Sequence, residues 1–212
     1  MISISGIKDQ AQLELLPYFT KSTAGMLIGK DGKNLDKKIE QLANKGYLIS
    51  LKKGMYVTDP YYSSVSNKEL YLEYVANILR YPSYLSLEYM LSKYNLIPEA
   101  TYQITSITNK STRLFQNQLG SFAYRSIKNK LFTGYSIVSG DTYTVAIATK
   151  AKTLFDFLYL KRNLGKDLET EIKASLRINW SQLQDEDIRE FKSYVKLSNS
   201  AKMERIAKYV NK

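Results

Sequence analysis

Lysine, asparagine and glutamine recur between residues 30 and 53, and the chemistry open to these side chains is nucleic-acid recognition. Lysine neutralises phosphate or donates to guanine, while Asn and Gln form paired hydrogen bonds with adenine. The stretch holds seven lysines against three acidic residues. We therefore expect these residues to contact duplex DNA. The candidates are Lys33, Asn34, Lys37, Lys38, Gln41, Lys52 and Lys53.

A helix and a hairpin are needed to position these side chains. "DGKNLDKKIEQLANKG" predicts a helix that Asp31 caps and Gly46 ends. Its apolar face is Leu35, Ile39, Leu42 and Ala43, which turns the candidate residues outward. "YLISLKKGMYV" predicts a hairpin with Lys52-Lys53-Gly54 at its tip, where Gly54 enters the left-handed region.

Two shorter helical patterns precede this helix. "DQAQLELLPYF" places Ala11, Leu15 and Leu16 on one face and stops near Pro17. "TKSTAGMLIG" offers Thr20 as the N-cap and Gly29 as the end, around an apolar face of Ala24, Leu27 and Ile28. Three helices followed by a hairpin are the order of a winged helix-turn-helix.

In a winged helix-turn-helix the third helix enters the major groove and its exposed residues meet the base edges. The wing lysines then reach the flanking phosphates, which adds affinity but little sequence information. Two alternatives stay open: winged helices also serve as protein-binding modules, and surface lysines are often only solvated.

The amino-acid composition further limits the kinds of partner and of catalytic or metal site that this protein can have. The 212 residues carry a net charge of +11, which favours an anionic partner such as nucleic acid, a membrane surface or an acidic protein. Cysteine and histidine are both absent, so the usual zinc sites, Ser-His-Asp triads and Cys-His dyads are excluded. We expect no cofactor and no metal. "MISISGIKDQ" does not have the pattern of a signal peptide, and no apolar run reaches about 18 residues, so we expect a cytoplasmic protein without membrane contact.

A second domain is predicted from about residue 61, which gives domains 1–60 and 61–212. "TDPYYSSVSN" is typical of a linker, and Ser66 with Glu69 fits a capping box for the next helix. Five Thr-, Tyr-, Val- and Ile-rich segments between residues 101 and 148 predict a mainly antiparallel sheet, with helical periodicity before and after it. The fold class is therefore α+β: an N-terminal winged helix-turn-helix followed by a mixed domain.

The runs "SYLSLEYMLSKYNLIPE", "ITSITNKSTRLFQNQLGSFAYRSIKNKLFTGY" and "VAIATKAKTLFDFLYLKRN" resemble the second domain of AbiEi-type antitoxins, and "FTKSTAGML" to "KGYLISLKKGMYV" resembles their winged helix. The likeness covers most of residues 10–163. It implies a bacterial abortive-infection antitoxin, active in phage defence, that represses its own operon promoter and counteracts a nucleotidyltransferase-like toxin. Family members often have aromatic-His-Gly where this chain has Lys93-Tyr94-Asn95; Asn also suits a left-handed position.

Two other hypotheses come from single residues. Asp156 followed by Glu171-x-Lys173 has the composition of a metal-dependent nuclease site, but "GKDLETEIKASL" has helical spacing, which would turn Glu171 and Lys173 in different directions. Tyrosines crowd residues 71–94, where they could stack on single-stranded nucleic acid, anchor a protein partner or pack in the core, and for Tyr74 we expect the core.

Overall fold

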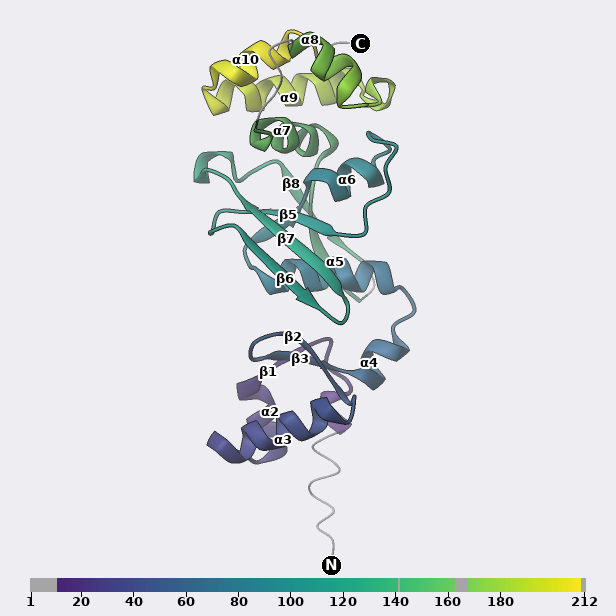
Figure 1. The fold of residues 1–212 in the computed structure, drawn as a ribbon, viewed down its shortest axis with the longest axis vertical. Coiled ribbons are helices and arrows are strands. Elements are labelled where there is room, and N and C mark those ends of the chain that lie inside the picture. Colours follow the sequence, from purple (N-terminus) through teal and green to yellow (C-terminus); the bar gives the residue numbers. More distant parts are fainter. Residues whose placement is uncertain (1–10, 141, 163–167, 211–212) are drawn as a thin grey trace, which may run out of the picture. The chain divides into compact units, whose positions relative to one another are not determined.

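The computed structural model describes residues 11–140, 142–162 and 168–210 (Figure 1). Residue contacts divide the chain into two compact units. Unit 1 comprises Met1–Leu72 with Gln116–Gly120, and unit 2 comprises Glu73–Phe115 with Ser121–Lys212. Both helices and strands occur in each unit, so the expected α+β class is confirmed.

In unit 1 the helices α2 and α3 lie beside a three-stranded antiparallel sheet of order β1-β3-β2. The expected second helix, third helix and hairpin are all present. The short strand β1, which pairs with β3 through Phe19 and Tyr56, was not predicted from the sequence. The elements are β1 (Phe19–Thr20), α2 (Lys21–Ile28), α3 (Gly32–Asn44), β2 (Leu48–Lys52) and β3 (Met55–Thr58).

Local sequence signals account for the helix ends in unit 1. The Thr23 backbone N–H donates to Thr20 Oγ1 at 3.2 Å, which caps α2 as expected. Gly29 ends α2 in the left-handed region at φ 67°, and Gly46 follows α3 at φ 73°. Asp31 holds the N-cap position of α3 but makes no side-chain cap bond.

The buried face of α3 is narrower than predicted. Leu35, Ile39 and Leu42 are buried as expected, whereas Ala43 is exposed because it lies one position beyond this stripe. Before β1, Leu13 is buried and Leu15 is 77% exposed, so the predicted face was wrong there. Backbone bonds between residues three apart, such as Leu16 N–H to Leu13 O, tighten the turn and change which side chains point inward. The winged-helix assignment also depends on residues 1–10, which lie outside the described residues, and it stays a prediction.

The expected linker is largely a helix. α4 spans Asp59–Ser64, with Pro60 in its first turn and the Tyr61 N–H donating to Thr58 Oγ1 at 3.1 Å. The next helix, α5 (Lys68–Leu79), is capped by Asn67 rather than by the predicted Ser66–Glu69 box. Asn67 Oδ1 accepts from the Leu70 N–H at 2.9 Å. The domain boundary expected at residue 60 stays a prediction.

Unit 2 is built on a six-stranded sheet of order β6-β7-β5-β4-β9-β8. The five strands expected between residues 101 and 148 are present, and β4 was missed. The sheet is mixed, because β4–β5 and β8–β9 are antiparallel whereas β4–β9 and β5–β7 are parallel, so the expected antiparallel pairing is confirmed in part. The strands are β4 (Ser83–Leu85), β5 (Ile104–Thr108), β6 (Arg113–Asn117), β7 (Gly120–Ser126), β8 (Tyr135–Ser139) and β9 (Thr144–Ala148).

Helices cover both faces of this sheet in unit 2 (Figure 1). The later turns of α5 lie on one face, where Tyr124 of β7 donates its hydroxyl to the Ala76 carbonyl. The other face packs against α6 and α7, and α9 and α10 pack on α7. These elements are α6 (Leu87–Lys93), η1 (Asn129–Leu131), α7 (Lys150–Leu160), α8 (Leu168–Thr170), η2 (Glu171–Ser175), η3 (Trp180–Gln182), α9 (Asp185–Ser198) and α10 (Ala201–Ala207).

The helical periodicity expected after the sheet is confirmed, because an apolar face of each of the later helices α7, α9 and α10 is buried. Ala151, Leu154, Phe155 and Leu158 of α7 are all buried in the main core. Phe191 and Val195 of α9 join them with Ile188 packed alongside, as do Met203, Ile206 and Val210 near the end of the chain, with Ala207 partly buried beside them. Asn95, after α6, has φ 55°, so the left-handed position expected for it is also confirmed.

Candidate nucleic-acid interface

The outer face of α3 presents most of the candidate DNA contacts to solvent. Lys33, Asn34, Lys37 and Gln41 are exposed and Lys38 is half-buried. Residues 33, 37 and 41 follow one another at intervals of four, which aligns them in one row along the helix. Neither Lys33 nor Lys37 forms an ion pair with a residue that the structure describes. Two ammonium groups and two amides on this face therefore remain available to a ligand.

Acidic residues also lie on α3, and one of them is paired. Asp36 forms an ion pair with Lys21, the first residue of α2. Both side chains are substantially exposed, so the pair contributes little to stability. Its electrostatic effect is local: Lys21 offsets a negative charge that would otherwise oppose an anion approaching α3.

The packing of α2 against α3 depends on a glycine. A Cβ at Gly25 would lie 3.0 Å from Leu35 Cδ2 and 3.0 Å from the Lys30 carbonyl oxygen. The Lys30 N–H donates to the Gly25 carbonyl at 3.1 Å. Glycine at this position thus permits the close approach that fixes α3 relative to α2, and so fixes the direction of its outer face.

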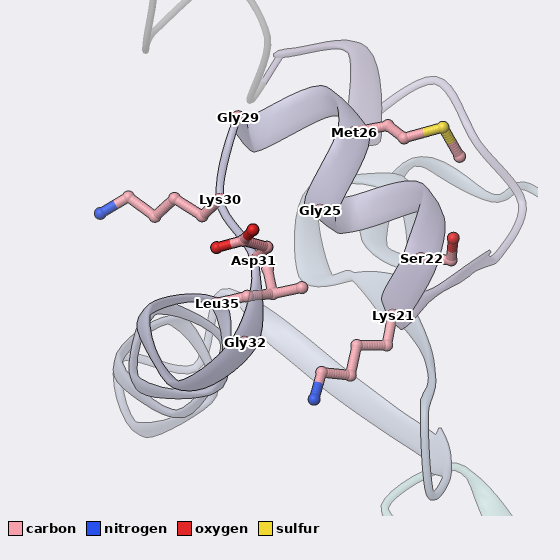
Figure 2. Close-up of a pocket in the computed structure, with 9 residues that line it drawn as sticks. All are labelled: Lys21, Ser22, Gly25, Met26, Gly29, Lys30, Asp31, Gly32 and Leu35. Atoms are coloured by element: carbon pink, nitrogen blue, oxygen red, sulfur yellow. The ribbon is translucent and has the colours of Figure 1, made fainter.

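An open groove of about 690 Å³ lies between α2 and the start of α3 (Figure 2). Figure 2 shows the side chain of Lys30 pointing away from both helices. Lys30 is exposed, as is Met26 on α2. The lining residues are Lys21, Ser22, Gly25, Met26, Gly29, Lys30, Asp31, Gly32 and Leu35.

The hairpin tip differs from the expected three-residue loop. Lys52 belongs to β2 and pairs with Met55, so that Lys53 and Gly54 alone form the turn, with Gly54 at φ 76°. Lys53 is exposed and Lys52 is half-buried. The Lys21 N–H donates to the Gly54 carbonyl at 2.9 Å, which ties the hairpin tip to the start of α2. The tip is therefore anchored within unit 1.

Lys21 and Lys30 were not among the residues predicted for the site. Lys21 follows the N-cap Thr20, and Lys30 follows the C-cap Gly29, so both flank the ends of α2. The sequence predicts both caps, so the positions of Lys21 and Lys30 directly beside them were the signal that could have added these lysines to the site. The bond from Lys21 to Gly54 had no such signal, because it joins residues that are 33 positions apart.

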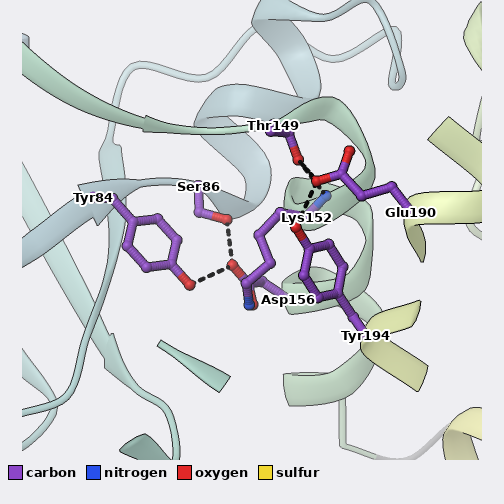
Figure 3. Close-up of polar contacts among 7 residues, drawn as sticks. All are labelled: Tyr84, Ser86, Thr149, Lys152, Asp156, Glu190 and Tyr194. Atoms are coloured by element: carbon purple, nitrogen blue, oxygen red, sulfur yellow. Dashed lines mark hydrogen bonds and ion pairs between the residues drawn. The ribbon is translucent and has the colours of Figure 1, made fainter. Parts of the chain in front are cut away.

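Unit 2 contains a buried polar network around Asp156 (Figure 3). Asp156 Oδ2 accepts from the Tyr84 hydroxyl at 3.0 Å and from Ser86 Oγ at 2.9 Å, and Oδ1 pairs with Lys152 Nζ. Neither Lys152 nor Asp156 is exposed to solvent. Burial raises the pKa of the Asp156 carboxyl, and the Lys152 ammonium opposes that shift. Burial likewise lowers the pKa of Lys152, while Asp156 acts in the opposite direction.

A second polar group lies next to this network. Glu190 Oε1 on α9 accepts from Thr149 Oγ1 at 2.8 Å and from the Tyr194 hydroxyl at 2.5 Å. Burial, together with the Glu190 hydrogen bond, raises the pKa of Tyr194. The stem of Lys152 passes between the two groups (Figure 3). Thr149 and Glu190 are half-buried, whereas Lys152 and Asp156 are closed to solvent. The polar groups therefore hold the sheet, α7 and α9 together rather than presenting a reactive Asp156.

The arrangement hypothesised for a nuclease is not formed by Asp156. Its carboxylate is fully buried and bonded to Lys152, Tyr84 and Ser86, whereas Glu171 is partly exposed on a helical turn. The predicted helical spacing there is confirmed; the side chain of Lys173 is outside the described part of the chain. Within the described ranges, no cluster of three or more Asp or Glu side chains is arranged to hold a metal.

Most tyrosines between residues 71 and 94 are packed rather than displayed. Tyr71, Tyr84 and Tyr89 are buried. Tyr74 is half-buried and stacks on Tyr143 with ring centroids 5.0 Å apart, so the prediction of a core position for it was only partly right. A continuous stacking surface for single-stranded nucleic acid is not formed by these residues.

Comparisons of the sequence with models of known protein families and with curated proteins give no match. Among the described helices, none combines the length and the apolar character needed to cross a membrane.

Proposed function

We propose that this chain is a duplex-DNA-binding transcriptional regulator in which α3 is the recognition helix and the β2–β3 hairpin is the wing of a winged helix-turn-helix. The observation that carries the proposal is the set of exposed cations without an ion pair to a described residue, Lys33 and Lys37 on α3 and Lys53 at the hairpin tip. These are the two elements that a winged helix presents to duplex DNA.

The roles divide by position. Asn34 and Gln41 are the candidates for reading base edges, because amides bind adenine through two hydrogen bonds. Lys33, Lys37, Lys38, Lys52 and Lys53 would contact phosphates or guanine. Lys30 adds a further cation between α2 and α3. The net charge of +11 supports attraction to DNA over the whole chain.

We further propose that the protein acts as an antitoxin that represses its own operon and binds a nucleotidyltransferase-like toxin through unit 2. This part rests on the resemblance of residues 10–163 to AbiEi-type antitoxins. The strands and helices that carry the resemblance in unit 2 form one folded body with a common core, which is a suitable platform for a protein partner.

Fluorescence anisotropy with duplex DNA from upstream of the gene tests the first part. Binding that falls steeply with salt and exceeds binding to a scrambled duplex is the expected result. Co-expression of the full chain with a nucleotidyltransferase encoded beside it tests the second part. Growth with the chain and arrest without it is the expected result, and arrest that the chain does not relieve would contradict the antitoxin role. Failure of the two purified proteins to co-elute would contradict toxin binding through unit 2.

A further inference from the structure

The strand β8 forms one edge of the six-stranded sheet and is exposed along its whole length. Among the strands that the structure describes, β9 is its only neighbour. All five residues of β8 are exposed, including Ile137 at 67% and Val138 at 49%. An edge strand presents unpaired backbone N–H and C=O groups, and apolar side chains flank those groups here.

The hydrogen bonds to β9 show which backbone groups of β8 face outward. The Thr149 N–H donates to the Gly134 carbonyl at 3.0 Å, and the Gly140 N–H donates to the Tyr143 carbonyl at 2.9 Å. In an antiparallel pair, bonded and non-bonded positions alternate. Gly134 and Gly140 are thus bonded positions, as are the even-numbered residues between them. The backbone groups of Tyr135, Ile137 and Ser139 point away from β9 to the free edge.

Nothing within β8 hinders another strand from pairing with it. The register with β9 is regular over five residues without a bulge, and the strand contains no charge and no proline. Charged residues, prolines and bulges are the usual protection of an edge. The opposite edge strand β6 differs, because it begins with the exposed Arg113. A regular, uncharged edge of this kind can accept a strand from a partner.

Charge favours an acidic partner over a second copy. Residues 61–212 contain 22 basic and 14 acidic side chains. Lys128 and Lys130, shortly before β8, are exposed and form no ion pair with a residue in the described ranges. Two copies would bring together chains of +11 each, whereas an acidic segment would be attracted to this surface.

We propose that β8 is a docking edge at which an acidic protein partner adds an extended strand, paired with the backbone of Tyr135, Ile137 and Ser139. The partner strand carries apolar residues at alternate positions, to cover Ile137 on one face and Val138 on the other. Acidic residues flank it. This inference deepens the proposed partner-binding role of unit 2 and rests on it.

Labelled synthetic peptides and the full chain test the edge. The probes are peptides of alternating Val and Thr, with Ile or Tyr replacing Val in parallel members, and with two glutamates at each end. Fluorescence anisotropy should show binding, and hydrogen exchange should show new protection at Tyr135, Ile137 and Ser139. Matching peptides with lysines at the ends should bind at least about tenfold more weakly, because they are repelled.

Two substitutions at Ile137 distinguish the contribution of its backbone N–H to peptide binding from that of its side chain. Ile137→Pro removes an outward N–H without removing a bond to β9, and should weaken peptide binding by about tenfold, the effect of leaving one partner carbonyl without its donor. Ile137→Lys should weaken it through charge on the edge. The matched control is Leu114→Lys, which places the same charge on the other edge strand and should leave binding unchanged.

Peptide binding that is absent, or that is insensitive to both Ile137 substitutions, overturns the proposal. Sedimentation of the full chain without peptide gives a further outcome: a dimer that Ile137→Lys dissociates would make a second copy the occupant, and would also overturn it. Duplex affinity, measured on each variant, should remain unchanged. If β8 does not bind the peptides but the partner still co-elutes with the chain, only the proposed docking position is wrong and the proposed function stands.

Discussion

Replacing Lys33, Lys37 and Lys53 together by alanine should make the proposed binding to duplex DNA much less dependent on salt concentration. Each phosphate contact contributes about 0.9 to the slope of log affinity against log salt, so three contacts contribute about 2.7. Between 50 and 200 mM salt, the parent chain should then lose about 40-fold more affinity than the triple variant. All three side chains are exposed, so unfolding free energy should change by less than about 0.5 kcal/mol for each substitution.

Fluorescence anisotropy at several salt concentrations measures this slope, and circular dichroism checks the fold. The matched control replaces Lys130, Lys192 and Lys196 of unit 2, which are also exposed. It removes the same total charge but should leave the slope nearly unchanged. An unaltered slope in the folded Lys33/Lys37/Lys53 variant would show that these lysines are merely solvated. An equal reduction in both variants would show that net charge acts without a defined interface.

Three further predictions follow from individual contacts. Asn34→Ala or Gln41→Ala should cost about 1 to 3 kcal/mol on the operator and little on random duplexes, and anisotropy that shows equal losses on both would exclude base reading. Asp156→Ala should destabilise the chain by about 3 to 5 kcal/mol in urea unfolding, because it leaves Lys152 buried without its counter-ion. The double variant with Lys152→Met and Asp156→Leu should lose much less stability. A double variant as unstable as the single one would contradict this explanation. Gly54→Ala should lower stability by about 1 to 2 kcal/mol through its left-handed backbone, with Gly54→Asn affected less, and equal melting temperatures for all three chains would disprove strain at the tip.

Local signals in the sequence were sufficient for most elements. The caps at Thr20 and Gly29, the row of Leu35, Ile39 and Leu42, and the apolar face of α7 each depend on neighbouring residues only. These are properties that periodicity and capping preferences report directly. The outward direction of Lys33 and Lys37 followed from the same periodicity.

Features that depend on distant partners were not predictable in this way. β4 is three residues long and is buried on both faces, so it has neither the length nor the alternation of a recognisable strand. Its pairing with β9 is parallel and joins residues more than 60 positions apart. The pairing of Lys152 with Asp156 also depends on the fold, because a Lys and an Asp four apart on a helix normally lie at the surface.

The most direct test of the central claim is a titration of the full chain against duplex DNA from upstream of its gene, beside a scrambled duplex of the same length and composition. At physiological salt, we expect at least about 1,000-fold tighter binding to the upstream duplex, as is usual for specific regulators. This preference should fall when Asn34 and Gln41 are both replaced by alanine. Equal affinity for the two duplexes, or no measurable binding to either, would contradict the claim that α3 reads DNA.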